Sequence, residues 1–180
     1  MVKRGGIGLI IIFLLLNCSG NSIDEDSTVI LRENIPDQET WDFDFIITNE
    51  GMLQSKIQAG HMVKFNSKGL YELDSSVGVD FFSKNGEHTS NIFSDSGFVE
   101  ENGNFITAKG NVKAVSDDGV ILLSEELKWD KSKNKIYTDK FVTIYSKGDT
   151  IRGYGFESDQ DMKKWKIIKP VGITERKITF

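Results

Sequence analysis

The chain has 180 residues, of which 38% are hydrophobic, 11% aromatic and 27% charged. This composition excludes a disordered chain, and a single cysteine excludes a disulfide scaffold or a cysteine-rich zinc module. The formal net charge of −5 argues against a nucleic-acid partner, because phosphate binding requires a basic surface. The length suits one domain with a tail.

The first residues have the pattern of a secretory signal. Lys3 and Arg4 precede an apolar run from Ile7 to Leu16 that is interrupted only by Gly8. Ten helical residues span about 15 Å, whereas the hydrocarbon core of a membrane requires about 20 residues. We therefore predict a cleaved signal peptide, with a membrane-spanning helix as the weaker alternative.

The only cysteine, Cys18, stands where the apolar run ends. Leu15-Leu16-Asn17-Cys18 resembles a bacterial lipobox, in which the cysteine is lipidated and becomes the first mature residue. Asn17 departs from the usual Gly, Ala or Ser at its position. We predict a lipoprotein signal peptide at residues 1–17 and a membrane anchor on Cys18. An ordinary signal peptide with an incidental cysteine is the alternative.

Residues 18–40 are predicted to form an acidic tether. Six Asp and Glu residues in this stretch are opposed by Arg32 alone, and the hydrophobic pattern has little periodicity. A charged segment of this kind stays extended and solvated. The short run Thr28-Val29-Ile30-Leu31 is the one part that could pair with a strand.

Residues 41–180 have a hydrophobic period of two, which predicts β-strands. Trp41-Asp42-Phe43-Asp44-Phe45 alternates aromatic and acidic residues, so the three aromatic side chains are expected on one face. Strand candidates are separated by turn groups that end in glycine, which accepts the positive φ of hairpin turns. These glycines are Gly51, Gly69, Gly86, Gly103, Gly119 and Gly148. The pattern predicts an all-β domain.

A loose internal repeat runs through these strands. An isoleucine is followed two residues later by a small residue and six residues later by an apolar one. The copies are Ile57/Ala59/Val63, Ile92/Ser94/Phe98, Ile106/Ala108/Val112 and Ile136/Thr138/Val142. Each copy is interpreted as a strand with an inward apolar face, a short turn and a further strand.

No arrangement of residues indicates catalysis. The chain has neither a Walker A motif nor a Gly-x-Ser-x-Gly motif. His61 and His88 lie in different predicted strands and are interpreted as surface histidines, with a two-histidine metal site as the alternative. We predict that the protein is not an enzyme and has no cofactor and no metal site.

Aromatic and aliphatic residues occupy both faces of the predicted strands. Phe81-Phe82, Phe105, Tyr145 and Phe156 illustrate the excess. Such a pattern fits two packed sheets with a filled core, or a lumen with an additional outer hydrophobic patch.

Motifs in the C-terminal half resemble the LptC family, the periplasmic component of the lipopolysaccharide export ABC transporter. They are Gly110-x-Val112, Leu127-x-Trp129-Asp130, Val142-x-Ile144 and Ile151-x-Gly153-x-Gly155. The likeness spans about residues 41–175 and is sharpest from 104 to 158. It implies an open β-jellyroll, a twisted antiparallel β-sandwich of the LptC/LptA type, over residues 41–180.

The resemblance implies transport without chemistry. An apolar lumen would receive the acyl chains of lipopolysaccharide from the inner-membrane ABC transporter, which docks at the N-terminal edge, and pass them to an LptA-like jellyroll at the C-terminal edge. The expected lumen residues are Ile106, Ala108, Val112, Leu122, Leu127, Trp129, Ile136, Val142, Ile144, Ile151, Phe156 and Ile167. A lipid-anchored structural or adhesion sandwich without lipid cargo is the alternative.

The resemblance also implies a location in the periplasm, at the inner membrane. Familiar members of the family carry a spanning helix, whereas this chain is predicted to carry a lipid on Cys18. Ser19 follows Cys18 and gives no support to retention at the inner membrane.

The C-terminal stretch is basic in an otherwise acidic chain. Residues 163–177 contain six Lys and Arg residues against Glu175 alone. We expect Trp165, Lys166 and Lys169 to form the partner edge that meets the downstream jellyroll. A solvated terminal strand, whose lysines discourage edge pairing, is the alternative.

Overall fold

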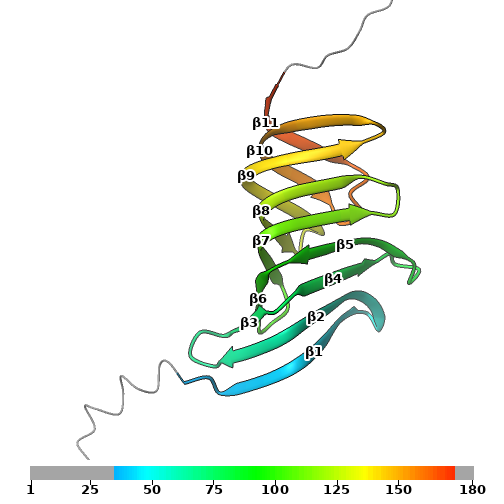
Figure 1. Ribbon diagram of the computed structural model, residues 1–180. Helices are drawn as coiled ribbons and strands as arrows, with labels where there is room; N and C mark the ends of the chain where they lie inside the picture. The colour runs from blue at the N-terminus through cyan, green and yellow to red at the C-terminus, as the bar shows by residue number, and fades with distance from the viewer. Residues whose placement is uncertain (1–34, 173–180) are drawn as a thin grey trace, which may run out of the picture. The chain divides into compact units, whose positions relative to one another are not determined.

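The computed structural model describes residues 35–172, which form eleven β-strands and no helix (Figure 1). In chain order the strands are β1 (Gln38–Asn49), β2 (Met52–Phe65), β3 (Leu70–Asp74), β4 (Val77–Phe82), β5 (His88–Ser94), β6 (Ser96–Glu100), β7 (Phe105–Ser116), β8 (Ile121–Asp130), β9 (Lys135–Ser146), β10 (Asp149–Asp159) and β11 (Trp165–Val171). Every pairing between them is antiparallel. The predicted all-β fold is confirmed.

Hairpin turns lie at all six positions where a glycine predicted them, and each of those glycines has a positive φ. Two further hairpin turns, at residues 131–134 and 160–164, contain no glycine. Asn134 and Met162 there adopt φ values of 50° and 55° themselves. These two turns were missed because the sequence rule relied on glycine.

The sheet branches at two long strands. Along one edge, the first half of β2 pairs with β4 and its second half with β3, while β1 covers the other edge. β7 likewise pairs with β6 through its first half and with β5 through its second half, opposite β8. The strands from β8 to β11 then follow in order. The pairs β4–β5 and β3–β6 therefore lie in two layers that share β2 and β7.

Long strands pass from one layer to the other at a corner, where the register shifts. The shifts fall between Lys109 and Val112 in β7 and between Tyr154 and Phe156 in β10. The first layer contains β4, β5 and residues 52–58, 112–116, 121–124, 141–146 and 149–154. The second layer contains β3, β6 and residues 61–65, 105–109, 127–130, 135–138, 156–159 and 165–167. In Figure 1 the later segments of the second layer cross behind the upper strands.

Two corners require glycine because atoms of a neighbouring segment come very close. A Cβ on Gly60 would lie 2.5 Å from the main-chain oxygen of Ser75, to which the Gly60 amide donates a hydrogen bond of 3.1 Å. Gly110 has a φ of 77°, and a Cβ there would lie 2.8 Å from Oδ2 of Asp95. A larger residue at either corner would push the two layers apart.

The internal repeat marks these corners. In all four copies the isoleucine and the small residue are buried. The third position is buried in the copies at Val112 and Val142 but only half-buried at Val63 and Phe98. The short turn expected inside each copy is wrong for three of them, because residues 57–63, 106–112 and 136–142 each lie within one continuous strand.

β1 corrects one expectation from the sequence. Phe43 and Phe45 pack against the core, but Trp41 is 64% exposed and its ring lies 5.3 Å from that of His61. Asp42 has a φ of 53°, which interrupts the regular alternation between Trp41 and Phe43. The strand also begins at Gln38, before the predicted start of the domain at residue 41.

Candidate lipid-binding interior and partner edges

The predicted lumen residues form one continuous apolar interior between the two layers. Ten of the twelve are at most 4% exposed, from Ile136, Val142 and Ile144 at 0% to Ile106 at 4%. Ile167 is half-buried against the same cluster, and Ile151 is 37% exposed. The side chains are therefore gathered as expected, whereas their contact with lipid remains a prediction.

Strand register explains why these side chains meet, because directly opposed residues share a face of the sheet. In the first layer Ala114, Leu122, Ile144 and Ile151 lie opposite one another on four successive strands. In the second layer Ile106, Trp129 and Ile136 do the same. Ile151 shares the inward face of Ile144 but lies near the end of the ladder, where fewer strands cover it.

The N-terminal strands also supply part of the interior. Ile57, Val79, Phe81 and Ile92 are buried in the same cluster. The rings of Phe81 in the first layer and Trp129 in the second layer lie 5.3 Å apart. The lumen prediction omitted these residues because it followed the family motifs. The internal repeat contained Ile57 and Ile92 and could have identified two of them.

The glycines of Ile151-x-Gly153-x-Gly155 allow β11 to dock. A Cβ on Gly153 would lie 2.4 Å from the main-chain oxygen of Lys169 and 2.5 Å from Cγ2 of Ile167. Gly155 has a φ of 75°, and a Cβ there would lie 2.9 Å from Cγ1 of Ile168. Side chains at both positions would displace β11, so this motif serves the C-terminal edge of the sheet.

Asp130, the last residue of Leu127-x-Trp129-Asp130, organises the turn between β8 and β9. Its Oδ1 accepts hydrogen bonds from Ser132 Oγ at 2.6 Å and from the Lys133 amide at 3.2 Å. The hydrogen bond from Ser132, followed by that from the Lys133 side chain, lowers the pKa of the Asp130 carboxyl. Leu127 and Trp129 point inward beside it, so one motif supplies both interior side chains and a turn anchor.

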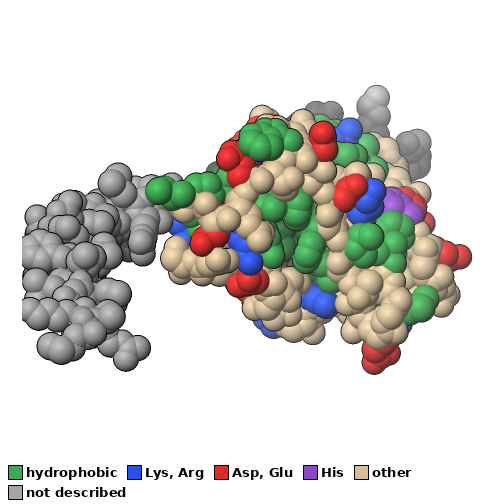
Figure 2. Space-filling model, turned by 90° about the horizontal axis from the view of Figure 1, so that it is seen from below, with side chains coloured by type: hydrophobic (Ala, Val, Ile, Leu, Met, Phe, Trp, Pro, Cys, Tyr) green, Lys and Arg blue, Asp and Glu red, His purple; other side chains and the backbone are tan. Residues whose placement is uncertain are grey.

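Half-buried aromatic side chains close the N-terminal end of the interior. Phe43 and Phe45 of β1 pack with Tyr71 of β3, with ring centroids 6.0 to 6.3 Å apart. Figure 2 shows this end from below, with hydrophobic side chains gathered in the middle and charged ones around them. The apolar interior therefore reaches the strand that forms the N-terminal edge.

The C-terminal end has an opening. A cavity of about 660 Å³ is lined by Val120, Ile151, Met162 and Trp165, with Lys147 and Lys163 among its polar residues. Trp165 is half-buried against the core cluster. The interior is thus continuous with a partly apolar mouth beside β11.

The two lysines of the predicted partner edge have different surroundings. Lys166 Nζ lies 3.1 Å from Glu157 Oε2, and Lys135 lies 3.2 Å from the other oxygen of the same carboxylate. The hydrogen bonds from Lys166 and then Lys135 lower the pKa of Glu157. Lys169 is exposed opposite Tyr154. Within the described residues, Lys166 therefore ties β11 to β10, and Lys169 is the better candidate for a partner contact.

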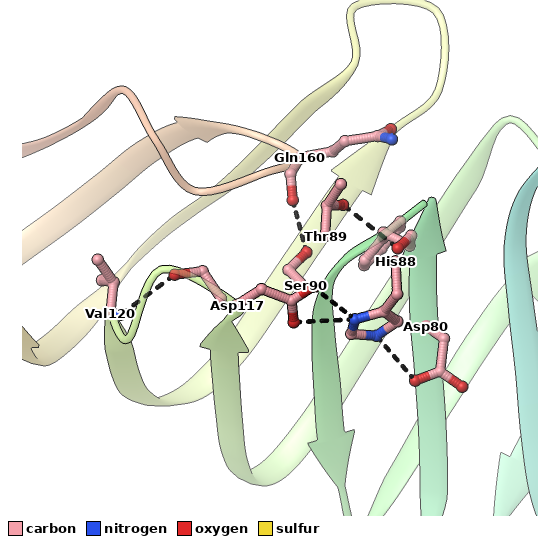
Figure 3. A network of polar contacts seen from close by, with 9 residues as sticks. Asp80, His88, Thr89, Ser90, Asp117, Val120 and Gln160 are labelled. Carbon is pink, nitrogen blue, oxygen red and sulfur yellow. Dashed lines mark hydrogen bonds and ion pairs between the residues drawn. The ribbon is translucent and has the colours of Figure 1, made fainter. Parts of the chain in front are cut away.

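Each histidine lies between two carboxylates. His61 contacts Asp74 through Nδ1 and Glu39 through Nε2, both at 3.0 Å, and the hydrogen bond to Asp74 is the main cause of its raised pKa. His88 Nδ1 lies 2.9 Å from Asp117 (Figure 3). Among residues 35–172 no group of three or more His, Cys, Asp or Glu side chains is arranged to hold a metal ion.

The fold defines a class. Two antiparallel layers that share their strands around an apolar interior, with a strand edge at each end, form an open β-jellyroll. A model of the LptC family, described as lipopolysaccharide-assembly, LptC-related, matches residues 7–174, so the chain belongs to this family. LptC proteins are periplasmic and non-catalytic. Membership of this family gives the protein a role in lipopolysaccharide transport.

Among solved structures, the chain is similar to LptH, the LptA homologous periplasmic component of the conserved lipopolysaccharide transport device from Pseudomonas aeruginosa. The two are 12% identical with a TM-score of 0.49, and the match covers 63% of this chain and 80% of LptH. A search of curated proteins finds no match.

Cys18 and the predicted signal peptide lie outside the described residues. Within residues 35–172, no helix is long and apolar enough to cross a membrane.

Proposed function

We propose that this protein receives lipopolysaccharide from the inner-membrane ABC transporter and passes it along the apolar interior to an LptA-like jellyroll. The observation that carries the proposal is the continuity of this interior from Phe43 and Phe45 at one end to Trp165 and Ile167 at the other. Both ends coincide with strands that pair on one side only within the described sheet, β1 and β11. A second jellyroll added at either edge would extend the same interior.

The chemistry of the cargo fits this interior. Each methylene group of an acyl chain gains about 0.8 kcal/mol when it leaves water for an apolar environment. Val112, Leu122 and Ile144 offer hydrocarbon surface without a charged neighbour on the inward face. The sugar and phosphate groups of the same molecule would remain in water outside the sheet.

Loading requires the packing of the interior to change. Phe81 and Trp129 are in ring contact between the layers and are 0% and 1% exposed, so this part of the interior is filled by side chains. An acyl chain would have to take the place of contacts between the layers. The same filled interior is what a lipid-anchored structural or adhesion sandwich would show, so that function is the second candidate.

The two edges would engage different partners by adding strands to the sheet. We assign the transporter subunits to the edge formed by β1 and the LptA-like jellyroll to the edge formed by β11. Lys169 is exposed at the second edge and would attract an acidic neighbour or a lipid phosphate. Trp165 would add apolar surface beside it.

We further propose that residues 1–17 are removed and that lipidated Cys18 holds the protein at the inner membrane, with residues up to 37 as the tether. Several acyl chains on one cysteine would provide stable attachment. Mass spectrometry of the N-terminal peptide from membrane-extracted protein tests this. An unmodified Cys18, or a mature chain that begins after it, would contradict the proposal.

Site-specific photo-crosslinking in the full chain tests the transport function. A photoreactive residue at Ile106, Val142 or Ile144 should capture lipopolysaccharide, because these side chains point into the interior. The same residue at Lys109 or Thr143 points outward and serves as the matched control, since Thr143 stands between two of the test positions. Equal labelling of both sets, or labelling of neither, would favour the structural sandwich instead.

A further inference from the structure

On the side of the jellyroll opposite the corners, each layer ends in a row of hairpin turns. The two rows face each other along a line. The first layer contributes residues 50–51, 83–86, 117–119 and 147–148, and the second layer contributes 66–69, 101–103, 131–134 and 160–164. We call this line the seam. Within residues 35–172 no strand pairing joins the two rows. The corners, in contrast, are closed by continuous backbone.

Side chains close the seam in its middle. Gln54 Nε2 donates a hydrogen bond of 2.9 Å to Asn134 Oδ1, which links β2 in the first layer to a turn of the second. Gln160 Nε2 donates a hydrogen bond of 2.9 Å to the main-chain oxygen of Phe82. Ser90 Oγ donates to the main-chain oxygen of Gln160 at 2.6 Å, as Figure 3 shows. The two glutamines come from opposite layers and reach across in opposite directions.

Each of the two glutamines also has a polar atom without a partner. Gln54 Oε1 and Gln160 Oε1 are buried and have no hydrogen-bond partner among the described residues. A cavity of about 270 Å³ lies between the two glutamines, lined also by Phe82 and Asn134. Opening the seam would hydrate these atoms, which offsets part of the loss of apolar contact behind them.

These observations single out where the layers can part. At the corners, separation would break backbone hydrogen bonds such as that from Asp95 to Gly110, at 3.0 Å. At the seam it breaks a few side-chain hydrogen bonds and brings water to groups that lack partners. The 660 Å³ mouth beside Met162 lies at the C-terminal end of the same line, beyond Gln160.

We propose that Gln54 and Gln160 are latches that keep the seam closed until the acyl chains of an amphiphile part the two layers there. This proposal rests on the proposed transport function and adds the place at which entry of the acyl chains is controlled. The head group would stay outside the seam while the chains enter sideways between the latches.

The first test replaces each latch by alanine and compares these variants with the same replacement at a control glutamine. Gln54→Ala and Gln160→Ala each delete one bridging hydrogen bond, while Gln58→Ala alters an exposed glutamine on the same strand as Gln54 but away from the seam. Each latch variant of the full chain should capture lipopolysaccharide about fivefold faster at a photoreactive Ile144, as expected for the loss of one hydrogen bond. Rates equal to that of Gln58→Ala would overturn the proposal.

The second test locks the seam covalently. Gln54→Cys with Asn134→Cys is bridged by a short, reducible bis-thiol reagent, because a glutamine–asparagine contact is too long for a direct disulfide. Thr107→Cys with Lys128→Cys, which are opposed on neighbouring strands of one layer, is the control. Peptide mass spectrometry distinguishes the intended bridge from any involving Cys18.

The expected result is a loss of at least about tenfold in capture at Ile144 when the seam is bridged, with recovery on reduction and no loss in the control pair. Full capture by the bridged protein would refute the latches while leaving transport intact. Failure of the unmodified protein to capture lipopolysaccharide at Ile144 would refute the proposed function itself. The two failures are therefore distinguishable.

Discussion

Replacing Gly153 by alanine should detach the C-terminal edge without shortening the chain. The added Cβ would lie 2.4 Å from the main-chain oxygen of Lys169 and 2.8 Å from the Cα of Pro170. Both are backbone atoms, so no change of side-chain rotamer relieves the contact. β11 must move by about 1 Å to restore an ordinary separation of 3.4 Å or more.

The size of the effect follows from this geometry. Overpacking of a well-packed site typically costs about 1–3 kcal/mol. We expect Gly153→Ala to lower the free energy of unfolding by about 2 kcal/mol, and the midpoint of thermal unfolding by about 4–8 °C for a protein of this size. Amide protection should be lost first in β10 and β11, because the displacement begins there.

Gly78→Ala is the matched control. Gly78 also lies in a strand, has no positive φ, and its added Cβ would meet the Phe93 ring at 3.8 Å, an ordinary contact. Its stability should be unchanged or higher by up to about 1 kcal/mol, because alanine restricts the unfolded chain. Unfolding midpoints that coincide for the two variants would refute the packing argument. Co-purification then tests binding at the C-terminal edge. The Gly153→Ala variant should no longer bind the downstream jellyroll, and the Gly78→Ala variant should still bind it.

Three further predictions concern the interior, the contact of His61 with Asp74, and the basic edge. Trp129→Ala should destabilise the protein by about 3–5 kcal/mol in urea unfolding, because the side chain is 1% exposed, whereas Phe141→Ala at 41% exposure should have a small effect. Comparable losses would mean that the interior is not tightly packed. The raised pKa of His61 means that its stabilising contacts are complete below the unfolded value of 6.5 and are lost as pH rises through the folded pKa. An NMR titration should show that Asp74→Asn lowers the His61 pKa, and an unchanged value would contradict the assigned cause. Lys169→Glu, or deletion of residues 163–180, should weaken co-purification with the downstream jellyroll, and the Lys169→Glu defect should shrink at high salt. Lys166→Glu should also loosen β11, because it would place a second carboxylate against Glu157. Undiminished binding after the deletion would place the docking edge at β1.

The motifs that carried the family resemblance each have a structural role. Gly110 sits at a corner beside Asp95, and Gly153 makes room for β11. Leu127 and Val142 point into the interior. These are local requirements of backbone space or side-chain direction, which is why they can be read in a single sequence.

The sequence by itself determined the strands, the six glycine turns and ten of the twelve inward side chains between Ile106 and Ile167. These features depend on a period of two residues and on the positive φ that glycine accepts, and both are local. Only the tertiary structure decided the division into two layers, because that depends on which strand each half of β2 and β7 joins. The same is true of the seam. Gln54 and Asn134 are 80 residues apart, and neither belongs to a pattern that could have paired them. Lys166 likewise lies in a stretch whose composition predicts an exposed basic edge. The register of β11 on β10 instead places it opposite Glu157, with which it forms an ion pair.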